Sequence, residues 1–206
     1  MMIVIVKGAR PVPGDSRERM VRSAASLIAA RGVSATSFSD VISDSGAPRG
    51  SIYHHFPEGK EQLAAEAVRW TSDRVIAYLR AGTGTTPAEV LQRFVNLWRQ
   101  VVLASGGASG CVVAGVALDS GADDEGESLI SVARETFRSW VDVLAGQLAE
   151  AGVPARQATA IAVTTLAGME GALILCRAES DVGPLDETAA ELMRLLPPTP
   201  AAPPDR

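Results

Sequence analysis

Histidine, cysteine and aromatic residues are scarce in this chain. Its 206 residues include two histidines, two cysteines and 4% aromatic side chains. The cysteines, Cys111 and Cys176, lie far apart, and the histidines are adjacent, at His54 and His55. Neighbouring side chains on a helix point about 100° apart, which is poor geometry for two ligands of one metal. These shortages predict no metal site, no disulfide framework and no cofactor, and they fit a reduced, cytoplasmic setting.

Signatures of catalysis are also missing. Residues 107–111 lack the last glycine of a G-x-S-x-G nucleophile elbow, and no strand is expected before them. Gly82 and Gly84 follow no expected strand, so they are not a dinucleotide-binding fingerprint. The zinc motif H-E-x-x-H does not occur. We therefore predict no catalytic residues, and an all-helical enzyme is the least favoured alternative.

We predict neither a membrane-spanning segment nor a targeting segment in this chain. We find no stretch of about 18 apolar residues, so we predict no membrane partner. Residues 1–14 begin with an apolar stub that has no basic segment before it and no small-residue cleavage site. We expect a disordered arm there, or a misplaced start codon, and a disordered proline-rich tail over residues 197–206.

The residues that are abundant favour a helical protein with two unlike parts. Hydrophobic residues make up 47% of the chain, enough to bury a core in one or two domains. Strand-like alternation is hard to find, so we predict an all-α fold. Residues 1–70 hold nine Lys and Arg against seven Asp and Glu, whereas the remainder holds ten against seventeen. This asymmetry favours a nucleic-acid-binding N-terminal part and a separate effector part.

Capping and stop signals divide most of the chain into helices. Thr86-Pro87-Ala88-Glu89 is a capping box with proline at the first helical position, and Gly106 ends the helix that it starts. Residues 119–127 are acidic and contain glycine, so we expect an exposed loop. The helices expected outside the segment from 37 to 60 span residues 15–31, 60–81, 87–105, 110–118, 128–151, 154–177 and 185–196.

The segment from Ser37 to Lys60 predicts two short helices joined by a turn at Gly46-Ala47-Pro48. Each short helix has one apolar face, and Pro48 suits the first turn of the second helix. We predict that the second helix displays a donor-rich set without acidic residues: Arg49, Gly50, Ser51, Tyr53, His54 and His55. Such a pair is typical of a helix-turn-helix whose second helix enters the DNA major groove.

The run GAPRGSIYHHFPEGKEQL resembles the DNA-binding signature of TetR-type transcriptional repressors. In that signature a glycine-led turn precedes a recognition helix that ends in Tyr-x-His-Phe, and a lysine opens the next helix. The clear match runs from about Ser16 to Arg69. A weaker resemblance to the LmrA/YxaF-like branch extends through Gly110-Cys111, Leu118 and Glu170-Gly171-Ala172.

Two positions depart from the broad TetR pattern. Pro48 stands where Ser or Lys is commoner, and this removes one polar side chain that could touch DNA. Gly59 lengthens the link between Phe56 and Lys60, which looks like a trait of the branch.

The resemblance implies a three-helix head over residues 15–60 and an effector-binding and dimerisation domain over residues 61–196. It also implies a homodimeric repressor that binds a palindromic operator and is released by a small, mostly apolar or aromatic ligand. A regulator or architectural DNA-binding protein without an effector is the alternative.

Within the head, Arg49 is the best candidate for base readout, because a guanidinium can bond O6 and N7 of guanine together. Tyrosine and histidine in such heads usually meet phosphates. Lys60 opposes the dipole at its helix start unless an anion lies there. The predicted DNA-binding residues are Ser37, Ser39, Arg49, Gly50, Ser51, Tyr53, His54, His55 and Lys60.

The candidate residues of the body are mostly apolar. Glu170 lies inside an apolar helix, and it either faces water, pairs with an arginine or anchors a ligand. Aromatic residues at helical spacing suit a plain core as well as a cavity wall. The predicted ligand pocket comprises Phe94, Trp98, Cys111, Phe137, Trp140, Leu166, Met169 and Glu170. A stripe of small and aliphatic residues predicts a dimer interface comprising Ile161, Thr165, Gly168, Ala172, Leu175, Leu192, Leu195 and Leu196.

Overall fold

The computed structural model describes residues 15–82, 84–119 and 129–197. These residues form helices and connecting turns without a strand, which confirms the all-α prediction. The predicted N-terminal arm and nearly all of the predicted acidic loop and C-terminal tail lie outside the described residues. In chain order the helices are α1 (Ser16–Arg31), α2 (Phe38–Ser45), α3 (Ser51–His55), α4 (Lys60–Arg80), α5 (Pro87–Ser105), α6 (Val112–Asp119), α7 (Leu129–Glu150), α8 (Ala155–Glu179) and α9 (Gly183–Met193).

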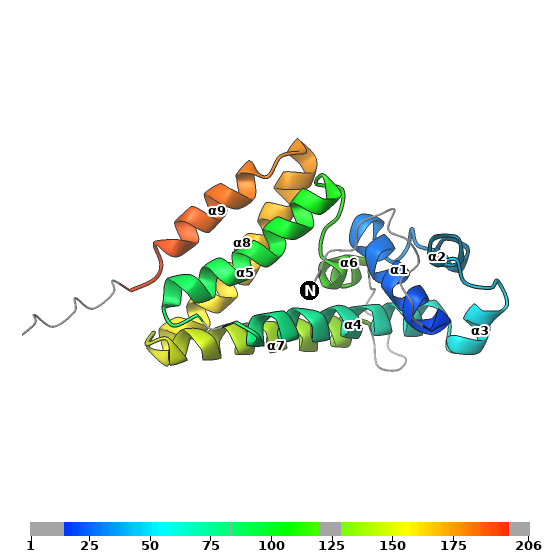
Figure 1. The fold of residues 1–206 in the computed structure, drawn as a ribbon, viewed down its shortest axis with the longest axis horizontal. Coiled ribbons are helices and arrows are strands. Elements are labelled where there is room, and N and C mark those ends of the chain that lie inside the picture. Colours follow the sequence, from blue (N-terminus) through cyan, green and yellow to red (C-terminus); the bar gives the residue numbers. More distant parts are fainter. Residues whose placement is uncertain (1–14, 83, 120–128, 198–206) are drawn as a thin grey trace, which may run out of the picture.

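Helices α1, α2 and α3 form a head at one end of the molecule, beside the first turns of α4 (Figure 1). The start of α2 is a capping box: the Ser37 hydroxyl accepts from the Asp40 N–H at 3.2 Å, and the Asp40 carboxylate accepts from the Ser37 N–H at 2.9 Å. Gly46 ends α2 in the left-handed region, at φ 65°. Ile52 and Phe56 are fully buried and fasten α3 to the rest of the head.

Polar contacts also hold the head together. Ser23 of α1 donates to the Asp44 carboxylate of α2 at 2.7 Å. The Arg17 guanidinium lies 5.5 Å from the centre of the Phe56 ring and forms a 2.7 Å ion pair with Glu66 of α4. These contacts connect α1 with the other three helices of this end, so the short α3 is held in place by tertiary packing.

The body is built from α4, α5 and α7–α9, with α6 between body and head (Figure 1). α4 extends from the head along α7, and α8 packs against both α7 and α9. The capping box predicted at Thr86 is present, with Glu89 as its partner. Arg99 of α5 joins Asp186 of α9 through two hydrogen bonds of 2.9 and 3.0 Å, and this pairing lowers the pKa of Asp186.

α8 is long and apolar enough to cross a membrane, with a mean hydropathy of 1.7 in its most apolar window. The sequence prediction overlooked this window. Nevertheless, α8 packs against α7 and α9, and residues along its length are buried inside the body. It is therefore the core helix of a folded domain, which gives no indication of a membrane.

Several helix ends differ from the sequence predictions, and two of these differences place predicted site residues outside a helix. α3 begins at Ser51, so Pro48 and Arg49 lie in the turn before the helix and Gly50 is its N-cap residue. The last helix ends at Met193, so Leu195 and Leu196 follow it instead of belonging to it. At α9 the apolar pattern continues past the last helical residue, whereas at α3 the proline suited to a first helical turn lies in the preceding turn, and such ends are hard to predict from sequence.

Candidate nucleic-acid interface and effector cavity

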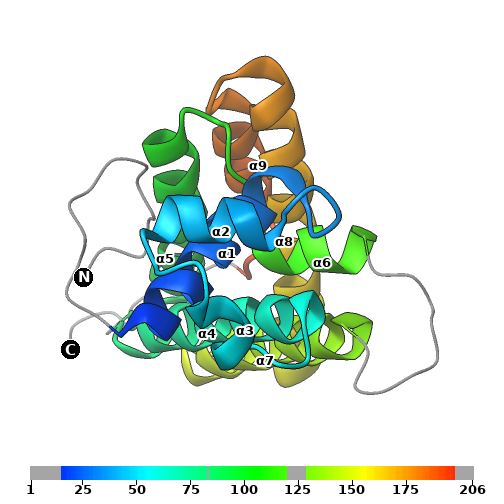
Figure 2. The ribbon, with the colours of Figure 1, turned by 90° about the vertical axis from the view of Figure 1, so that its right-hand side faces the viewer.

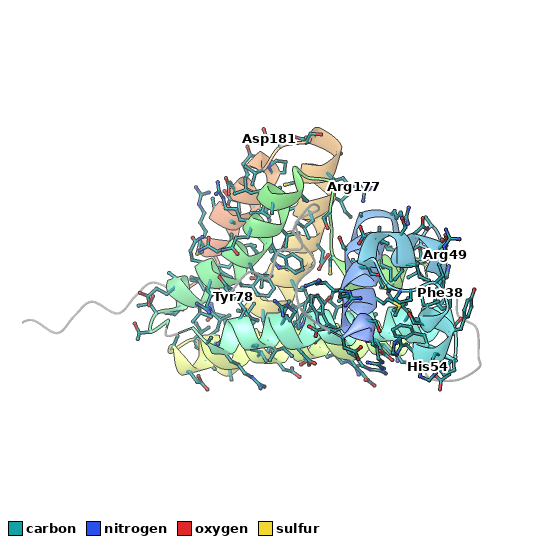
Figure 3. All side chains as sticks on the ribbon, turned by 45° about the vertical axis from the view of Figure 1, so that its right-hand side comes forward. Phe38, Arg49, His54, Tyr78, Arg177 and Asp181 are labelled. Atoms are coloured by element: carbon teal, nitrogen blue, oxygen red, sulfur yellow. The ribbon has the colours of Figure 1, made fainter. Side chains whose placement is uncertain are left out.

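The end of the molecule that carries α3 presents several polar side chains to solvent. Phe38, Arg49 and His54 lie together at this end, away from Arg177 (Figure 3). Tyr53 is 68% exposed, and its ring meets that of Phe38 edge-on, with the ring centres 5.5 Å apart. An aromatic hydroxyl held in this way can reach a phosphate without reorganising the head.

Arg49 and Gly50 are exposed in the turn that leads into α3. Ser51 closes this turn, because its N–H and its hydroxyl both donate to the Pro48 carbonyl, at 3.0 and 2.7 Å. The Arg49 side chain forms no ion pair within the described residues. Arg49 therefore projects from the N-terminal end of the recognition helix, where side chains of such motifs meet base edges.

The two adjacent histidines have different environments. His54 is exposed, whereas His55 is half-buried. The Nε2 atom of His55 lies 2.9 Å from the Ser16 hydroxyl, a hydrogen bond that joins the end of α3 to the start of α1. The structure thus gives His55 a partner inside the head, and the two residues cannot be treated as an equivalent pair.

Lys60 and Ser37 also have partners inside the head. The Lys60 ammonium donates to the carbonyls of Val33 and Ser34, at 3.0 and 3.5 Å. These carbonyls supply the negative partner that an exposed lysine at a helix start needs, which the sequence reasoning assigned to an external anion. The Ser37 hydroxyl donates to Asp40 at 2.6 Å, and its hydrogen bonds are the main cause of the lowered pKa of that carboxyl. Ser39 is exposed.

An apolar cavity of about 80 Å³ lies where the head meets the body. Its walls come from α1, α4, α5 and the segment that precedes α6. They comprise Ala25, Ser26, Ala29, Trp70, Thr71, Val75, Leu97, Trp98, Val101, Ser105, Ser109, Gly110, Cys111 and Val112. A ligand in this cavity would touch a head helix and body helices at the same time.

A larger groove of about 680 Å³ runs along the outer surface near the end of α4 and α7. Charged residues of both signs line it, including Arg80, Glu135, Arg138 and Asp142. It is open to solvent, so an apolar ligand would remain largely hydrated there. Ligand sites usually bury most of their ligand among apolar walls, so the smaller cavity is the better candidate.

Of the eight residues predicted for the ligand pocket, Trp98 and Cys111 line the cavity. The other six do not, and four of these are buried elsewhere in the core: Phe94, Trp140, Leu166 and Met169. Aromatic rings of this group pack on one another, with centroids 5.9 Å apart for Trp98 and Trp140 and 5.9 Å apart for Phe137 and Trp140. Most of the predicted pocket is therefore packed core.

Glu170 lies at the edge of this core. Burial raises the pKa of its carboxyl to about 7, and a hydrogen bond with the Cys111 thiol offsets part of the increase. Its Oε1 atom is inaccessible and lacks a hydrogen-bond partner. Burial and the nearby negative charge of Glu170 raise the pKa of Cys111 well above its ordinary value, so this thiol is protonated and unreactive at neutral pH.

The short helix α6 joins the head to the body. It lies beside α1, as the view onto the head end shows (Figure 2), and it also packs on α7. Just before α6, the Gly110 N–H donates to the Ala29 carbonyl at 2.9 Å. At its end, Asp119 accepts a 3.0 Å hydrogen bond from the Ser34 N–H. These two hydrogen bonds connect α6 and the residues before it to the last turn of α1 and to the loop that follows α1.

The predicted dimer stripe points largely into the protomer. Ile161, Thr165, Ala172 and Leu192 are buried, so the prediction that they face a partner is wrong. Leu175 and Leu195 are exposed, whereas Gly168 and Leu196 are half-buried. The outward face of α8 carries a different set of apolar residues: Val163, Ala167, Gly171, Ile174, Leu175 and Ala178.

Comparison with known proteins identifies the family. Residues 21–67 match the profile of bacterial regulatory proteins of the TetR family, and residues 87–191 match the C-terminal domain of LmrA/YxaF-like transcriptional regulators. A helix-turn-helix-type transcriptional regulator of Mycobacterium tuberculosis is 39% identical over 183 residues, covering 87% of this chain and 93% of the relative. The chain belongs to the TetR family of transcriptional regulators.

Further relatives support the same assignment. The transcriptional regulators YxaF and LmrA of Bacillus subtilis are 31% and 30% identical; each alignment covers 84% of this chain, and 90% and 92% of the respective relative. A TetR regulator from Legionella pneumophila has the same fold, with a TM-score of 0.79 and 23% identity over 90% of this chain and 99% of that chain. These relatives and family profiles are transcriptional regulators, which sets aside the alternative of an enzyme.

Several residues of this TetR-family protein were missed by the sequence reasoning. Ala25, Ser26 and Ala29 of the head line the cavity, and Asp119 bonds to the head. The sequence predicted no role for these three small residues of α1, because it carries no signal that α1 also borders the body. Asp119 was expected to open an exposed loop, and its acceptor role depends on a contact 85 residues away in sequence.

Proposed function

We propose that this protein is a cytoplasmic, homodimeric repressor that binds a palindromic operator and is released by a small, mostly apolar ligand. The observation that carries the proposal is the composition of the cavity wall. Ala25, Ser26 and Ala29 come from the head, whereas Trp98 and Cys111 come from the body. A ligand there contacts both parts directly, and it can favour one orientation of the head over another.

For operator binding, we assign base readout to Arg49 and phosphate contacts to Ser39, Tyr53 and His54. These side chains are exposed at the same end of the molecule, and a guanidinium suits the paired acceptors of guanine. Gly50 lets the backbone of the turn approach the duplex. We assign supporting roles to Ser37, Ser51, His55 and Lys60, because their polar groups already have partners within the head.

For dimerisation, we propose the outward face of α8. Val163, Gly171, Ile174 and Leu175 form an exposed apolar strip, and the small residues within it allow close helix packing. Isolated exposed apolar residues are ordinary, but a continuous strip along one helix is typical of an interface. Two heads held in this way address half-sites about 34–36 Å apart, or a multiple of that distance.

For release, the ligand must bind the DNA-free arrangement more tightly than the DNA-bound one, since equal affinity shifts nothing. The cavity borders the segment that leads into α6. Gly110 in this segment is hydrogen-bonded to the last turn of α1, and Asp119 at the end of α6 is hydrogen-bonded to the loop after α1. Occupation of the cavity therefore acts on the contacts that orient the head.

The test is selection of operator fragments from a library of genomic DNA by the purified full-length protein. We expect enrichment of a palindrome whose half-sites are one helical turn, or a multiple, apart. Footprinting should then show two protected half-sites. The number of protein chains bound per operator should be two or a multiple of two. Enrichment of unrelated fragments with equal affinity would contradict operator recognition, and binding by a monomer would contradict the proposed assembly.

A further inference from the structure

A carboxyl group lies almost unpaired in the interior, next to the effector cavity. The Oε1 atom of Glu170 has no hydrogen-bond partner and no access to solvent. Cys111 lines the cavity and is hydrogen-bonded to the same carboxyl group. One thiol is a weak donor, whereas a well-satisfied buried carboxylate accepts two or three N–H bonds. The weak Cys111 donor therefore leaves the carboxylate form of Glu170 poorly satisfied, directly behind the cavity wall.

No cation compensates this carboxyl within the part of the chain that the structure describes. Its pKa is raised to about 7 by burial, and the Cys111 thiol is the single cause that opposes the increase. A lysine or arginine beside Glu170 would instead lower the pKa. Near neutral pH the carboxyl is therefore ionised in part of the molecules, which makes it available to a positively charged ligand.

The cavity on the other side of Cys111 has aromatic and apolar walls. Trp98 lines the cavity and is 3% exposed, and its Nε1 atom also lacks a hydrogen-bond partner. Aromatic ring faces attract organic cations, most strongly where water is excluded. The wall hydroxyls of Thr71 and Ser105 already donate to main-chain carbonyls, at 2.9 and 2.8 Å. The cavity thus has an aromatic wall at Trp98 and, behind the Cys111 thiol, a carboxyl group that can become negatively charged.

We infer that the effector is a small organic amine whose ammonium group takes the place of the Cys111 thiol as the partner of Glu170, while its apolar part fills the cavity against Trp98. This inference rests on the proposed effector-responsive function. The cavity of about 80 Å³ suits a single six-membered ring, since one water needs about 10–15 Å³. A carboxylate ligand would meet like charge at Glu170, and a neutral alcohol would form a weaker hydrogen bond.

The inference is tested by calorimetric titration of the full-length protein with three probes of similar size: benzylamine, benzyl alcohol and benzoate. At pH 7 benzylamine should bind at least roughly tenfold more tightly than benzyl alcohol, because a charged hydrogen bond is the stronger one. Benzoate should bind most weakly. Binding of benzylamine should also release protons, because pairing ionises the carboxyl in those molecules where it was protonated.

Two variants locate the site. In Glu170→Gln the tenfold preference should fall to within about twofold and the proton release should vanish. In the matched control Glu135→Gln, at an exposed position on α7, both should remain. A benzyl alcohol affinity equal to that of benzylamine overturns the inference. An amine preference that survives in Glu170→Gln also overturns it.

Operator binding measured in the same samples separates this inference from the proposed function. Release caused by benzyl alcohol or benzoate, but not by benzylamine, supports the repressor switch and overturns the amine class. Amine-selective binding that leaves operator affinity unchanged supports the amine site and contradicts the switch. Failure of all three probes to bind overturns the amine site, while operator selection still tests the regulatory role.

Discussion

The Asp119 carboxylate, at the end of α6, accepts a 3.0 Å hydrogen bond from the backbone N–H of Ser34 in the loop after α1. This bond connects the body to the head. Replacing Asp119 with Ala should make the Ser34 amide exchange roughly fivefold faster, since a hydrogen bond of this kind contributes about 1 kcal/mol. Amide exchange followed by NMR measures the effect. Asp142→Ala, at an exposed position on α7, should leave the Ser34 amide unchanged.

Gly32 should tolerate substitution less well than Gly46. Gly32 combines φ 84° with ψ 171°, a region essentially restricted to glycine, and a Cβ there would collide with the Asp119 carboxylate. Gly46 has φ 65° with open space around it. We expect Gly32→Ala to lower the free energy of unfolding by about 2–3 kcal/mol and Gly46→Ala by about 1 kcal/mol.

Denaturant titration measures both substitutions at Gly32 and Gly46. If the collision contributes, Gly32→Ala combined with Asp119→Ala should cost less than the sum of the two single substitutions. Simple additivity would show that the backbone conformation alone accounts for the loss.

Arg49 should determine the preference at one operator position. Arg49→Ala should weaken binding to the selected palindrome by about 1–3 kcal/mol and relax the preference for one base. Arg156→Ala is the matched control, because that arginine is exposed at the start of α8, far from the head. The affinities of the Arg49→Ala and Arg156→Ala proteins for a set of single-base operator variants distinguish these two substitutions. Unchanged base preference in Arg49→Ala would remove Arg49 from base readout.

Glu170 should make the stability of the protein fall as pH rises. The pKa of this carboxyl is about 7 in the folded protein and near 4.5 when exposed, so between these values the folded state binds more protons. The contribution of Glu170 to the free energy of unfolding is fully present below about pH 4.5 and is lost as the pH rises through about 7. The total loss is at most about 3 kcal/mol. Cys111, the titratable neighbour, has its pKa raised well above its ordinary value and stays protonated throughout this range.

The test is to measure the free energy of unfolding at several pH values between about 5 and 8, at a fixed protein concentration. Glu170→Gln should remove the part of the pH dependence that is attributed to Glu170. Glu135→Gln should retain it, because Glu135 is exposed. Parallel pH profiles for the wild type and Glu170→Gln would mean that Glu170 titrates as an ordinary surface carboxyl.

Ile174 should be essential for the proposed dimer. It is 64% exposed on the outward face of α8, and a charge introduced there would be buried without a partner at the interface. We expect Ile174→Asp to shift the protein to monomers in sedimentation at micromolar concentration and to abolish high-affinity operator binding. Leu103→Asp, at an exposed leucine of α5, should remain dimeric. Dissociation by Leu103→Asp alone would place the interface elsewhere.

Those helix boundaries of this protein that the sequence predicts have local causes. The capping boxes at Ser37 and Thr86 and the stop at Gly106 involve residues within a turn of one another. The same holds for the turn before α3, whose hydrogen bonds join Ser51 to Pro48. Such short-range signals also carried the resemblance to the TetR head.

The tertiary structure alone decided which faces of the helices meet. α8 is apolar on all sides, so its composition could not indicate that Ile161 and Thr165 point inward and Val163 and Ile174 outward. The partner of His55 lies 39 residues away in sequence, and the apolar cavity between head and body combines four separate segments. Periodicity reports how one helix is divided into faces, whereas partners and cavities depend on packing between helices that are distant in the chain.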